Sequence, residues 1–171
     1  MQTIILGKRS YISKNLSENI KNSKIYSLEE FINLYKKYYY KKKISLIINS
    51  FYPSSKLNII NNYEDFSRNS ILNISKLLDI LNKKKIHKII YTSSSAVYGI
   101  NIEEKEKIKN YSRSIYGSFK LSAEGLIKSF SVKNKIKFVV ARVFNIYGKN
   151  DNNFSVISKI RNILLKKKKK N

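Results

Sequence analysis

The sequence is poor in the residues that most often form cross-links and loops. It has no cysteine, one proline and five glycines among 171 residues. Without cysteine, disulfides and thiolate chemistry are excluded. A single histidine, His87, excludes a histidine-rich metal site, and no metal is expected. With so little proline and glycine, few segments can serve as flexible linkers, so the chain is expected to form one domain.

Acidic residues and long apolar runs are also scarce. Eleven acidic residues stand against 35 basic ones, which gives a formal charge of +24. No apolar run approaches the roughly 18 residues that a membrane-spanning helix needs. The apolar run that follows Met1 is too short for a signal peptide. We therefore expect a cytoplasmic protein with no membrane partner.

The positive charge raises the question of polyanion binding. The basic residues are 30 lysines and 5 arginines, and Lys, Asn and Ile together make up 77 of the 171 residues. An A/T-rich coding sequence favours this composition, whereas nucleic-acid readers use arginine for bidentate contacts to bases and phosphates. Compositional drift is the favoured interpretation, so no specific nucleic-acid partner is expected. A basic protein that binds polyanions through its lysines stays open as an alternative.

The hydrophobic pattern predicts strands that alternate with helices. Short apolar runs predict strands at residues 3–6, 24–27, 44–49, 88–93 and 137–142. Apolar residues at helical spacing predict helices at residues 10–20, 28–35, 59–82, 112–131 and 154–165. Ser27, followed by Glu30 three residues later, predicts a capping box. This alternation predicts an α/β fold of the doubly wound Rossmann type, with a mainly parallel sheet of about five strands flanked by helices.

In such a fold, ligands bind at the carboxyl ends of the strands, and the first of these ends carries a small turn. Residues 7–13, Gly-Lys-Arg-Ser-Tyr-Ile-Ser, follow the first predicted strand and lead into a helix. Dinucleotide-binding folds place glycines here so that the backbone can approach a pyrophosphate at the helix N-terminus. Only Gly7 is a glycine, because Ser10 and Ser13 take the other two small positions. By itself the turn is equally compatible with an ordinary strand-turn-helix.

Two further groups of polar residues follow the later strands. Residues 91–99, Tyr-Thr-Ser-Ser-Ser-Ala-Val-Tyr-Gly, come directly after a buried strand, although serine clusters also occur in ordinary turns. Tyr116 and Lys120 share one face of a predicted helix. A free tyrosine has a pKa near about 10, and a neighbouring ammonium is expected to lower it. Tyr–Lys pairs at this spacing are common in so lysine-rich a chain, but this one lies 22 residues after Ser94 and precedes Leu-Ser-Ala-Glu.

These segments resemble the extended short-chain dehydrogenase/reductase family of NAD-dependent epimerases and dehydratases that modify sugar nucleotides. Residues 91–99 look like its Ser-Ser-x-x-Val-Tyr-Gly segment, and residues 116–124 look like its Tyr-x-x-x-Lys helix. Residues 142–148 are similar to its Arg-x-x-Asn-x-Tyr-Gly segment, and Asn69 is similar to an Asn at the start of its long central helix. The matches run through about 80 residues in the family's order.

The resemblance implies a catalytic group and a reaction class. Tyr116 would be the general acid/base on a sugar hydroxyl or ketone, and Ser94 would hydrogen-bond the same oxygen. Lys120 would hold the nicotinamide ribose and lower the pKa of Tyr116. Asn145 would lie on the substrate side, and Asn69 would play a supporting part. The reaction would be hydride transfer to and from NAD or NADP in an epimerase, dehydratase or reductase acting on a nucleotide sugar.

The resemblance also implies the cofactor site. It assigns the cofactor to the turn after the first strand, on Gly7, Ser10, Tyr11, Ile12 and Ser13. The family's acidic partner of the ribose 2′-hydroxyl is missing at residues 26–27. Because Lys8 or Arg9 would favour a 2′-phosphate, the interpretation leans slightly to NADP.

The chain departs from the family at two places. The strand that is normally third is not predicted, because only a helix separates residues 24–27 from residue 44. After a dinucleotide-binding domain at residues 1–165, a lysine-rich tail at 166–171 stands where the family continues into a substrate lobe. An A-run encodes such a tail and is prone to frameshifts, so a truncated and inactive chain is expected as one possibility. A non-catalytic remnant or scaffold is a second alternative, and a homodimer through helices 60–82 and 112–131 is the expected assembly.

Overall fold

The structure, a computed structural model, describes residues 1–49, 63–98, 114–148 and 156–168, and all structural statements below refer to these. Its strands are β1 (Gln2–Leu6), β2 (Ser23–Tyr26), β3 (Ile44–Ile48), β4 (Ile86–Ser94) and β5 (Lys137–Val143). They form one sheet in the order β2-β1-β3-β4-β5, and each neighbouring pair is parallel. The predicted doubly wound, mainly parallel sheet is confirmed.

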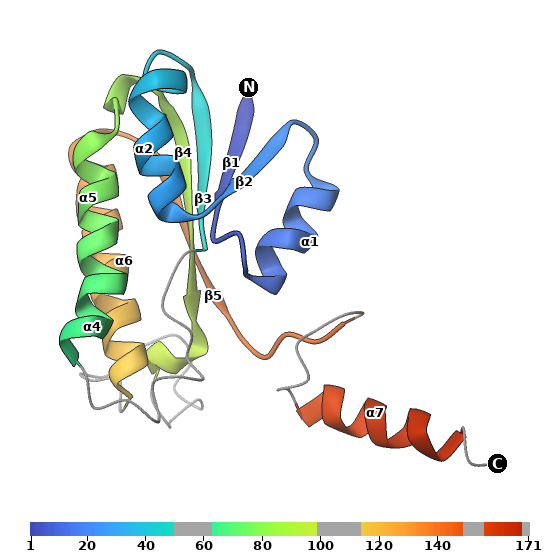
Figure 1. The fold of residues 1–171 in the computed structure, drawn as a ribbon. Coiled ribbons are helices and arrows are strands. Elements are labelled where there is room, and N and C mark those ends of the chain that lie inside the picture. Colours follow the sequence, from blue (N-terminus) through green and yellow to red (C-terminus); the bar gives the residue numbers. More distant parts are fainter. Residues whose placement is uncertain (50–62, 99–113, 149–155, 169–171) are drawn as a thin grey trace.

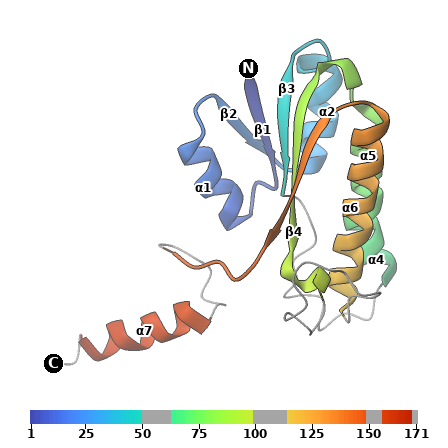
Figure 2. The ribbon, with the colours of Figure 1, turned by 180° about the vertical axis from the view of Figure 1, so that it is seen from behind.

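Helices cover the two faces of the sheet unequally. They are α1 (Tyr11–Asn19), α2 (Leu28–Tyr38), α4 (Tyr63–Ser67), α5 (Asn73–Ile80), α6 (Ile115–Lys133) and α7 (Val156–Lys168). Helices α2, α4, α5 and α6 lie on one face, and α1 lies on the other (Figure 1). The view from behind shows α7 set apart from the sheet (Figure 2). The predicted flanking helices are thus present.

Several predicted boundaries shift by a few residues. The long central helix runs from 63 to 80, with a π-helical turn at Arg68–Leu72 between α4 and α5, and a 3-10 turn follows at Lys83–Lys85. The predicted capping box is present, since Ser27 accepts from the Glu30 N–H and Glu30 accepts from the Ser27 N–H. Helix α7 continues into the predicted lysine tail. Predicted positions 59–62, 99, 112–113, 154–155 and 169–171 lie outside the described residues.

The connection between β2 and β3 decides where the sheet changes direction. Only α2 separates these two strands along the chain, and β3 pairs directly with β1. The strand that was not predicted from the sequence is therefore not present between them. The first crossover runs from β1 to β2, and the second returns from β2 past β1 to β3, so the switch point lies between the carboxyl ends of β1 and β3.

The core explains why the strands read as apolar runs. All five residues of β3 are buried, and so are the last three of β1. On the covered face they pack against Leu28, Phe31 and Tyr35 of α2 and against Leu77 of α5. Burying each such side chain stabilises the fold by about 1.5–3 kcal/mol. The core therefore holds the carboxyl ends of β1, β3 and β4 in fixed register, and the polar residues gather there.

Candidate active site

The turn after β1 brings the backbone very close to the end of β3. Gly7 has a φ of +117°, which residues with a Cβ rarely adopt. A Cβ at Gly7 would lie 2.6 Å from the backbone oxygen of Asn49. The N–H groups of Gly7 and Lys8 donate to the Tyr26 carbonyl at 2.8 and 3.1 Å, which ties the turn to β2. Both the conformation and the close approach therefore require glycine at this position.

Helix α1 begins directly after this turn. Its N-cap residue Ser10 makes no side-chain capping hydrogen bond, and its first turn contains no acidic residue. Ser10 is partly exposed, whereas Ser13 is fully buried. Tyr11 and Ile12 line a groove of about 340 Å³ together with Ile146, which follows β5. Of the two serines predicted to face a pyrophosphate, Ser10 is partly accessible and Ser13 is not.

Asn49 lies at the centre of this edge and was not identified as a site residue from the sequence. Its amide nitrogen donates to Ser10 Oγ at 2.7 Å and to Ser13 Oγ at 2.8 Å. Its amide oxygen accepts from Thr92 Oγ1, at the end of β4, at 2.6 Å. The available signal was a polar residue directly after a buried apolar strand, at the edge where the Gly7 turn was expected. One side chain thus connects the ends of β1, β3 and β4.

The predicted catalytic residues are brought together at the end of β4 and the start of α6. Ser94 ends β4, and its hydroxyl forms a hydrogen bond with the Tyr116 side chain. Lys120 lies one helical turn after Tyr116, with its Nζ 5.7 Å from the centre of the Tyr116 ring. That Nζ also donates to the Thr92 carbonyl at 2.8 Å. The side chain of Ser114 accepts from the Gly117 N–H and starts α6, which fixes where Tyr116 is placed.

Burial changes the charge states of this group. Burial raises the pKa of Tyr116, while its hydrogen bond to Ser94 lowers it to a smaller extent. In the chain without cofactor the pKa of Tyr116 is therefore raised by burial, and the expected lowering by Lys120 stays a prediction. Burial lowers the pKa of Lys120 to about 7, although nearby Glu124 raises it. The buried lysine consequently carries only part of a positive charge at neutral pH, which weakens its effect on the phenol.

A partly buried ion pair joins α6 to β5 near Lys120. The carboxylate of Glu124 accepts from Arg142 Nε at 3.1 Å and from the Arg142 terminal nitrogen at 2.8 Å, and it also accepts from the Ser93 hydroxyl. The Arg142 guanidinium stacks on the Tyr98 ring at 4.7 Å. The hydrogen bonds that Arg142 donates to Glu124 raise the pKa of Arg142. Glu124 and Arg142 both lie inside the segments that suggested the family, yet their pairing could not be read from the sequence.

Two predicted site residues lie away from this group. Asn145 is exposed in the segment that follows β5. Asn69 is exposed on the π-helical turn, where its amide nitrogen donates to the Asp65 carbonyl of its own helix at 2.8 Å. The structure therefore does not join these two residues to Ser94, Tyr116 and Lys120. Their roles stay predictions.

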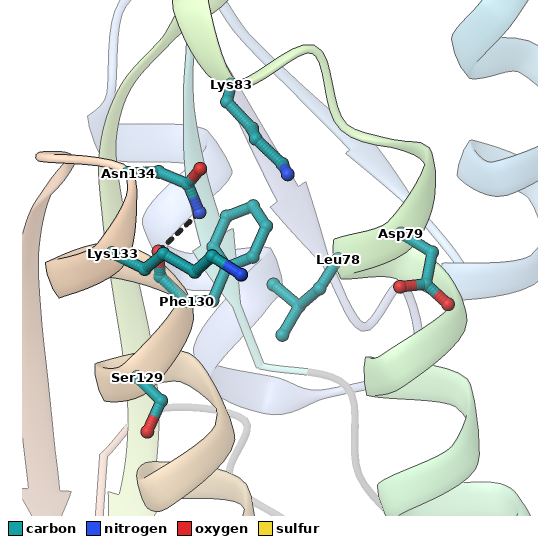
Figure 3. A pocket seen from close by; sticks show the side chains of 7 residues that line it. All are labelled: Leu78, Asp79, Lys83, Ser129, Phe130, Lys133 and Asn134. Carbon is teal, nitrogen blue, oxygen red and sulfur yellow. Dashed lines mark hydrogen bonds between the residues drawn. The ribbon is translucent and has the colours of Figure 1, made fainter.

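A second cavity among the described residues lies away from this site. A pocket of about 310 Å³ lies between the C-terminal ends of α5 and α6, with Phe130 and Leu78 at its floor and Lys83, Lys133 and Asp79 around it (Figure 3). These residues precede β4 and β5, so the pocket lies at the opposite edge of the sheet. Within the described ranges, no group of three metal-ligating side chains is found, and no helix is both long and apolar enough to cross a membrane.

The strand-end arrangement agrees with the similarity of the sequence to one family. Residues 33–170 match the NAD-dependent epimerase/dehydratase family. The chain belongs to this family. The match includes the segments that carry Asn49, Ser94, Tyr116 and Lys120. The alternatives of a non-catalytic remnant and of a polyanion-binding protein are not favoured by these similarities.

Individual proteins resemble the chain over nearly all of its length. A dTDP-D-glucose 4,6-dehydratase of Dictyostelium discoideum is 30% identical over 97% of this chain and 42% of that protein. Among solved structures, a UDP-N-acetylglucosamine 4-epimerase of Methanobrevibacter ruminantium has a TM-score of 0.73 and 23% identity, covering 96% of this chain and 63% of that one. RMD of Pseudomonas aeruginosa, solved with NADPH, has a TM-score of 0.76 and 21% identity, covering 100% and 64%. The chain spans less than half the length of the curated relatives that it matches.

Proposed function

We propose that this chain supplies the nicotinamide-binding and proton-transfer part of an epimerase, dehydratase or reductase that acts on a nucleotide sugar. The observation that carries the proposal is the Ser94–Tyr116 hydrogen bond with Lys120 one turn away, at the sheet edge that also holds the Gly7 turn. Family membership supports the reaction class. The similar dTDP-D-glucose 4,6-dehydratase and UDP-N-acetylglucosamine 4-epimerase are named for sugar nucleotides, which supports the substrate class.

The turn after β1 fits the diphosphate of a dinucleotide in the chemistry of its donors. Gly7 lets the backbone turn tightly, and Ser10 leaves the N-terminus of α1 without a side-chain cap. No acidic side chain in the first turn of α1 would repel an anion. Helix N-termini attract anions because their N–H groups point outward and their dipole favours negative charge. The bound nicotinamide would accept or donate the hydride.

The residues of this chain would then move the proton. Tyr116 would give its phenolic proton to a sugar oxygen, or take one from it, and Ser94 would hold the same oxygen in place. The raised pKa of Tyr116 in the free chain means that the phenol is protonated before ligands bind, which suits an acid. Lys120 is buried against Thr92 and Tyr116, where its ammonium would contact the cofactor ribose. In its charged form it would also stabilise the phenolate.

The choice between NAD and NADP is a finer part of the proposal. Lys8 and Arg9 are exposed at the turn and favour a 2′-phosphate, which leans the proposal to NADP. Lys8 Nζ, however, lies 3.0 Å from the Glu30 carboxylate, which the capping box holds at the end of β2. This carboxylate partly offsets the charge of Lys8. The proposed preference for NADP therefore depends mainly on Arg9.

Direct binding tests the proposal. Titration with NADH and NADPH, followed by calorimetry, should give a dissociation constant in the micromolar range for at least one of them. Lys120→Met should weaken that affinity by about tenfold or more, because a ribose contact is lost. Lys128→Met, at an exposed position of the same helix, is the matched control and should leave it unchanged. A native chain that binds neither nucleotide would refute the proposal.

Turnover tests the catalytic part separately. The native chain is mixed with a panel of UDP- and dTDP-sugars and the cofactor. NMR of the sugars follows epimerisation and dehydration, which return the hydride to the sugar, and the loss of reduced-nicotinamide absorbance follows reduction. Tyr116→Phe should lower any rate by about 10²- to 10⁴-fold while the cofactor affinity stays within about twofold. An equal rate in Tyr116→Phe would remove the assigned role of the phenol.

The assembly and location are further proposals. We infer a homodimer through α4–α5 and α6, where Leu72 and Val132 expose apolar side chains. Light scattering should then give twice the 20.0 kDa mass of one chain. A mass of one chain at micromolar concentration would contradict the dimer. A cytoplasmic location stays a prediction from the sequence.

A further inference from the structure

We propose that Asn49 is the positioning residue of the dinucleotide-binding turn, and that it orients two serines which stand where the family has glycines. The inference rests on the proposed function, since the ligand of the turn is taken to be the diphosphate of a nicotinamide dinucleotide. Asn49 is not assigned to ligand contact. It acts through Ser10 and the backbone of the turn.

The Asn49 amide is oriented with its oxygen toward Thr92 and its nitrogen toward the turn. Its oxygen accepts from Thr92 Oγ1 at 2.6 Å, and the same hydroxyl lies 3.2 Å from the Ile48 carbonyl. The two protons of that nitrogen are both used, one on Ser10 Oγ and one on Ser13 Oγ. Each serine oxygen is therefore an acceptor toward Asn49, and each serine keeps its own proton to donate elsewhere.

Ser10 is the serine for which this matters. It caps no N–H of α1 and is partly exposed, whereas Ser13 is fully buried. With its oxygen held by the Asn49 amide, the Ser10 hydroxyl can offer its proton to an anion in front of α1. Hydrogen bonds to charged acceptors are roughly twice as strong as neutral ones. Asn49 thereby lets Ser10 donate a hydrogen bond to the ligand, which a glycine at this position could not do.

The backbone of Asn49 makes this orientation rigid. Its N–H donates to the Leu6 carbonyl at 2.9 Å, which fixes it against the end of β1. Its carbonyl oxygen lies so close to Gly7 that a Cβ there would meet it at 2.6 Å. Asn49 is consequently held by β1, by the Gly7 turn and by Thr92 at once. Such a held donor pays little ordering entropy when a ligand binds.

The decisive variant reverses the hydrogen-bond direction without changing the shape. Asn49→Asp keeps an oxygen for Thr92, but its second oxygen accepts from the serine hydroxyls and takes the proton that Ser10 would give to the ligand. It also adds a negative charge behind the turn. We expect the aspartate variant to fold with a melting temperature close to the native one and to bind the dinucleotide at least about 100-fold more weakly.

A double-mutant cycle separates positioning from a general structural effect. Asn49→Ala should weaken binding of the preferred dinucleotide, NADH or NADPH, by about tenfold in the native background. In the Ser10→Ala/Ser13→Ala background the same change should weaken it by less than about twofold, because the partners are already gone. Asn82→Ala is the matched control, since its amide nitrogen donates to the Tyr40 carbonyl at 3.0 Å, away from the turn. It should leave the affinity unchanged.

A ligand-free measurement keeps the two proposals distinguishable. Hydrogen exchange of the amides of residues 7–13 should be at least about fivefold faster in Asn49→Ala than in the native chain. If the native chain binds no dinucleotide, the proposed function fails, and unchanged exchange would then overturn the inference on Asn49 as well. If the native chain binds, two results overturn the inference on Asn49. One is an affinity of Asn49→Ala equal to that of the native chain. The other is an equal loss of affinity on Asn49→Ala in the native background and in the Ser10→Ala/Ser13→Ala background. If the alanine variant does not fold, the aspartate variant decides by itself, and native-like affinity overturns the inference.

Discussion

Replacing Lys120 by methionine should make the protein more stable below neutral pH. Lys120 is 4% exposed, and burial lowers its pKa from 10.5 to about 7. At about 1.4 kcal/mol for each pH unit, this difference corresponds to roughly 5 kcal/mol of destabilisation while the lysine is charged. The methionine loses the hydrogen bond to the Thr92 carbonyl, which costs about 1–3 kcal/mol. At pH 6, Lys120→Met should therefore be more stable than the native chain by about 3 kcal/mol.

The sign of the pH dependence follows from which state binds the proton. Between pH 7 and 10.5 the unfolded chain holds the proton on Lys120 and the folded chain does not, so the native protein gains stability as pH rises. The advantage of Lys120→Met should consequently shrink by about 1.4 kcal/mol for each pH unit above 7 and disappear near pH 9.

Urea denaturation of the native chain, Lys120→Met and Lys128→Met at pH 6, 7.5 and 9 measures this difference. The exposed control Lys128→Met should not reproduce the trend. Free energies of unfolding that run parallel with pH for the native chain and Lys120→Met would refute the reasoning. A confirmed trend would show that this lysine is kept at a cost in stability, as expected for a functional group rather than a structural one.

Three further changes test other parts of the site. Arg142→Met should destabilise the fold by about 3 kcal/mol in urea denaturation, because Glu124 stays buried without its partner. Adding Glu124→Gln should recover most of that loss. If the effects of the two changes on the free energy of unfolding simply add, the pairing is contradicted. Gly7→Ala should lower the free energy of unfolding by about 2 kcal/mol or more in the same assay, because of the positive φ of Gly7 and the nearby carbonyl at the end of β3. A loss under about 0.5 kcal/mol would show that the turn relaxes. Glu30→Gln should raise the ratio of NADPH affinity to NADH affinity by about threefold in calorimetry, because Lys8 loses its ion pair with the Glu30 carboxylate. An unchanged ratio would exclude Lys8 from recognition of the 2′-phosphate.

Local pattern was sufficient for the elements of this fold. Parallel strands buried on both faces, such as β3, read as continuous apolar runs, and the helices read as apolar stripes at helical spacing. The capping box at Ser27 is also local and was predicted correctly. The π-helical turn at Arg68–Leu72 was not predicted, because it interrupts an apolar spacing that continues on both sides of it.

The grouping of Ser94, Tyr116 and Lys120 was predictable because these residues lie at the ends of successive elements. In a parallel α/β sheet those ends share one edge, so Ser94 and Tyr116 were expected to meet once the order of strands was known. The charge state of Tyr116 was not predictable in the same way. It depends on how deeply the phenol is buried and on whether Lys120 stays charged, and both are properties of the packed structure.

The sequence by itself thus determined the fold class, the family and the residues at the strand ends, since these depend on periodicity and on short motifs. Only the tertiary structure decided that Asn49 joins three strand ends, that Glu124 pairs with Arg142, and that Lys120 is buried enough to lose part of its charge. The physical reason is that hydrogen-bond partners and desolvation arise from contacts between segments far apart in the chain. No local pattern records which polar side chain faces which, or how much water remains around it.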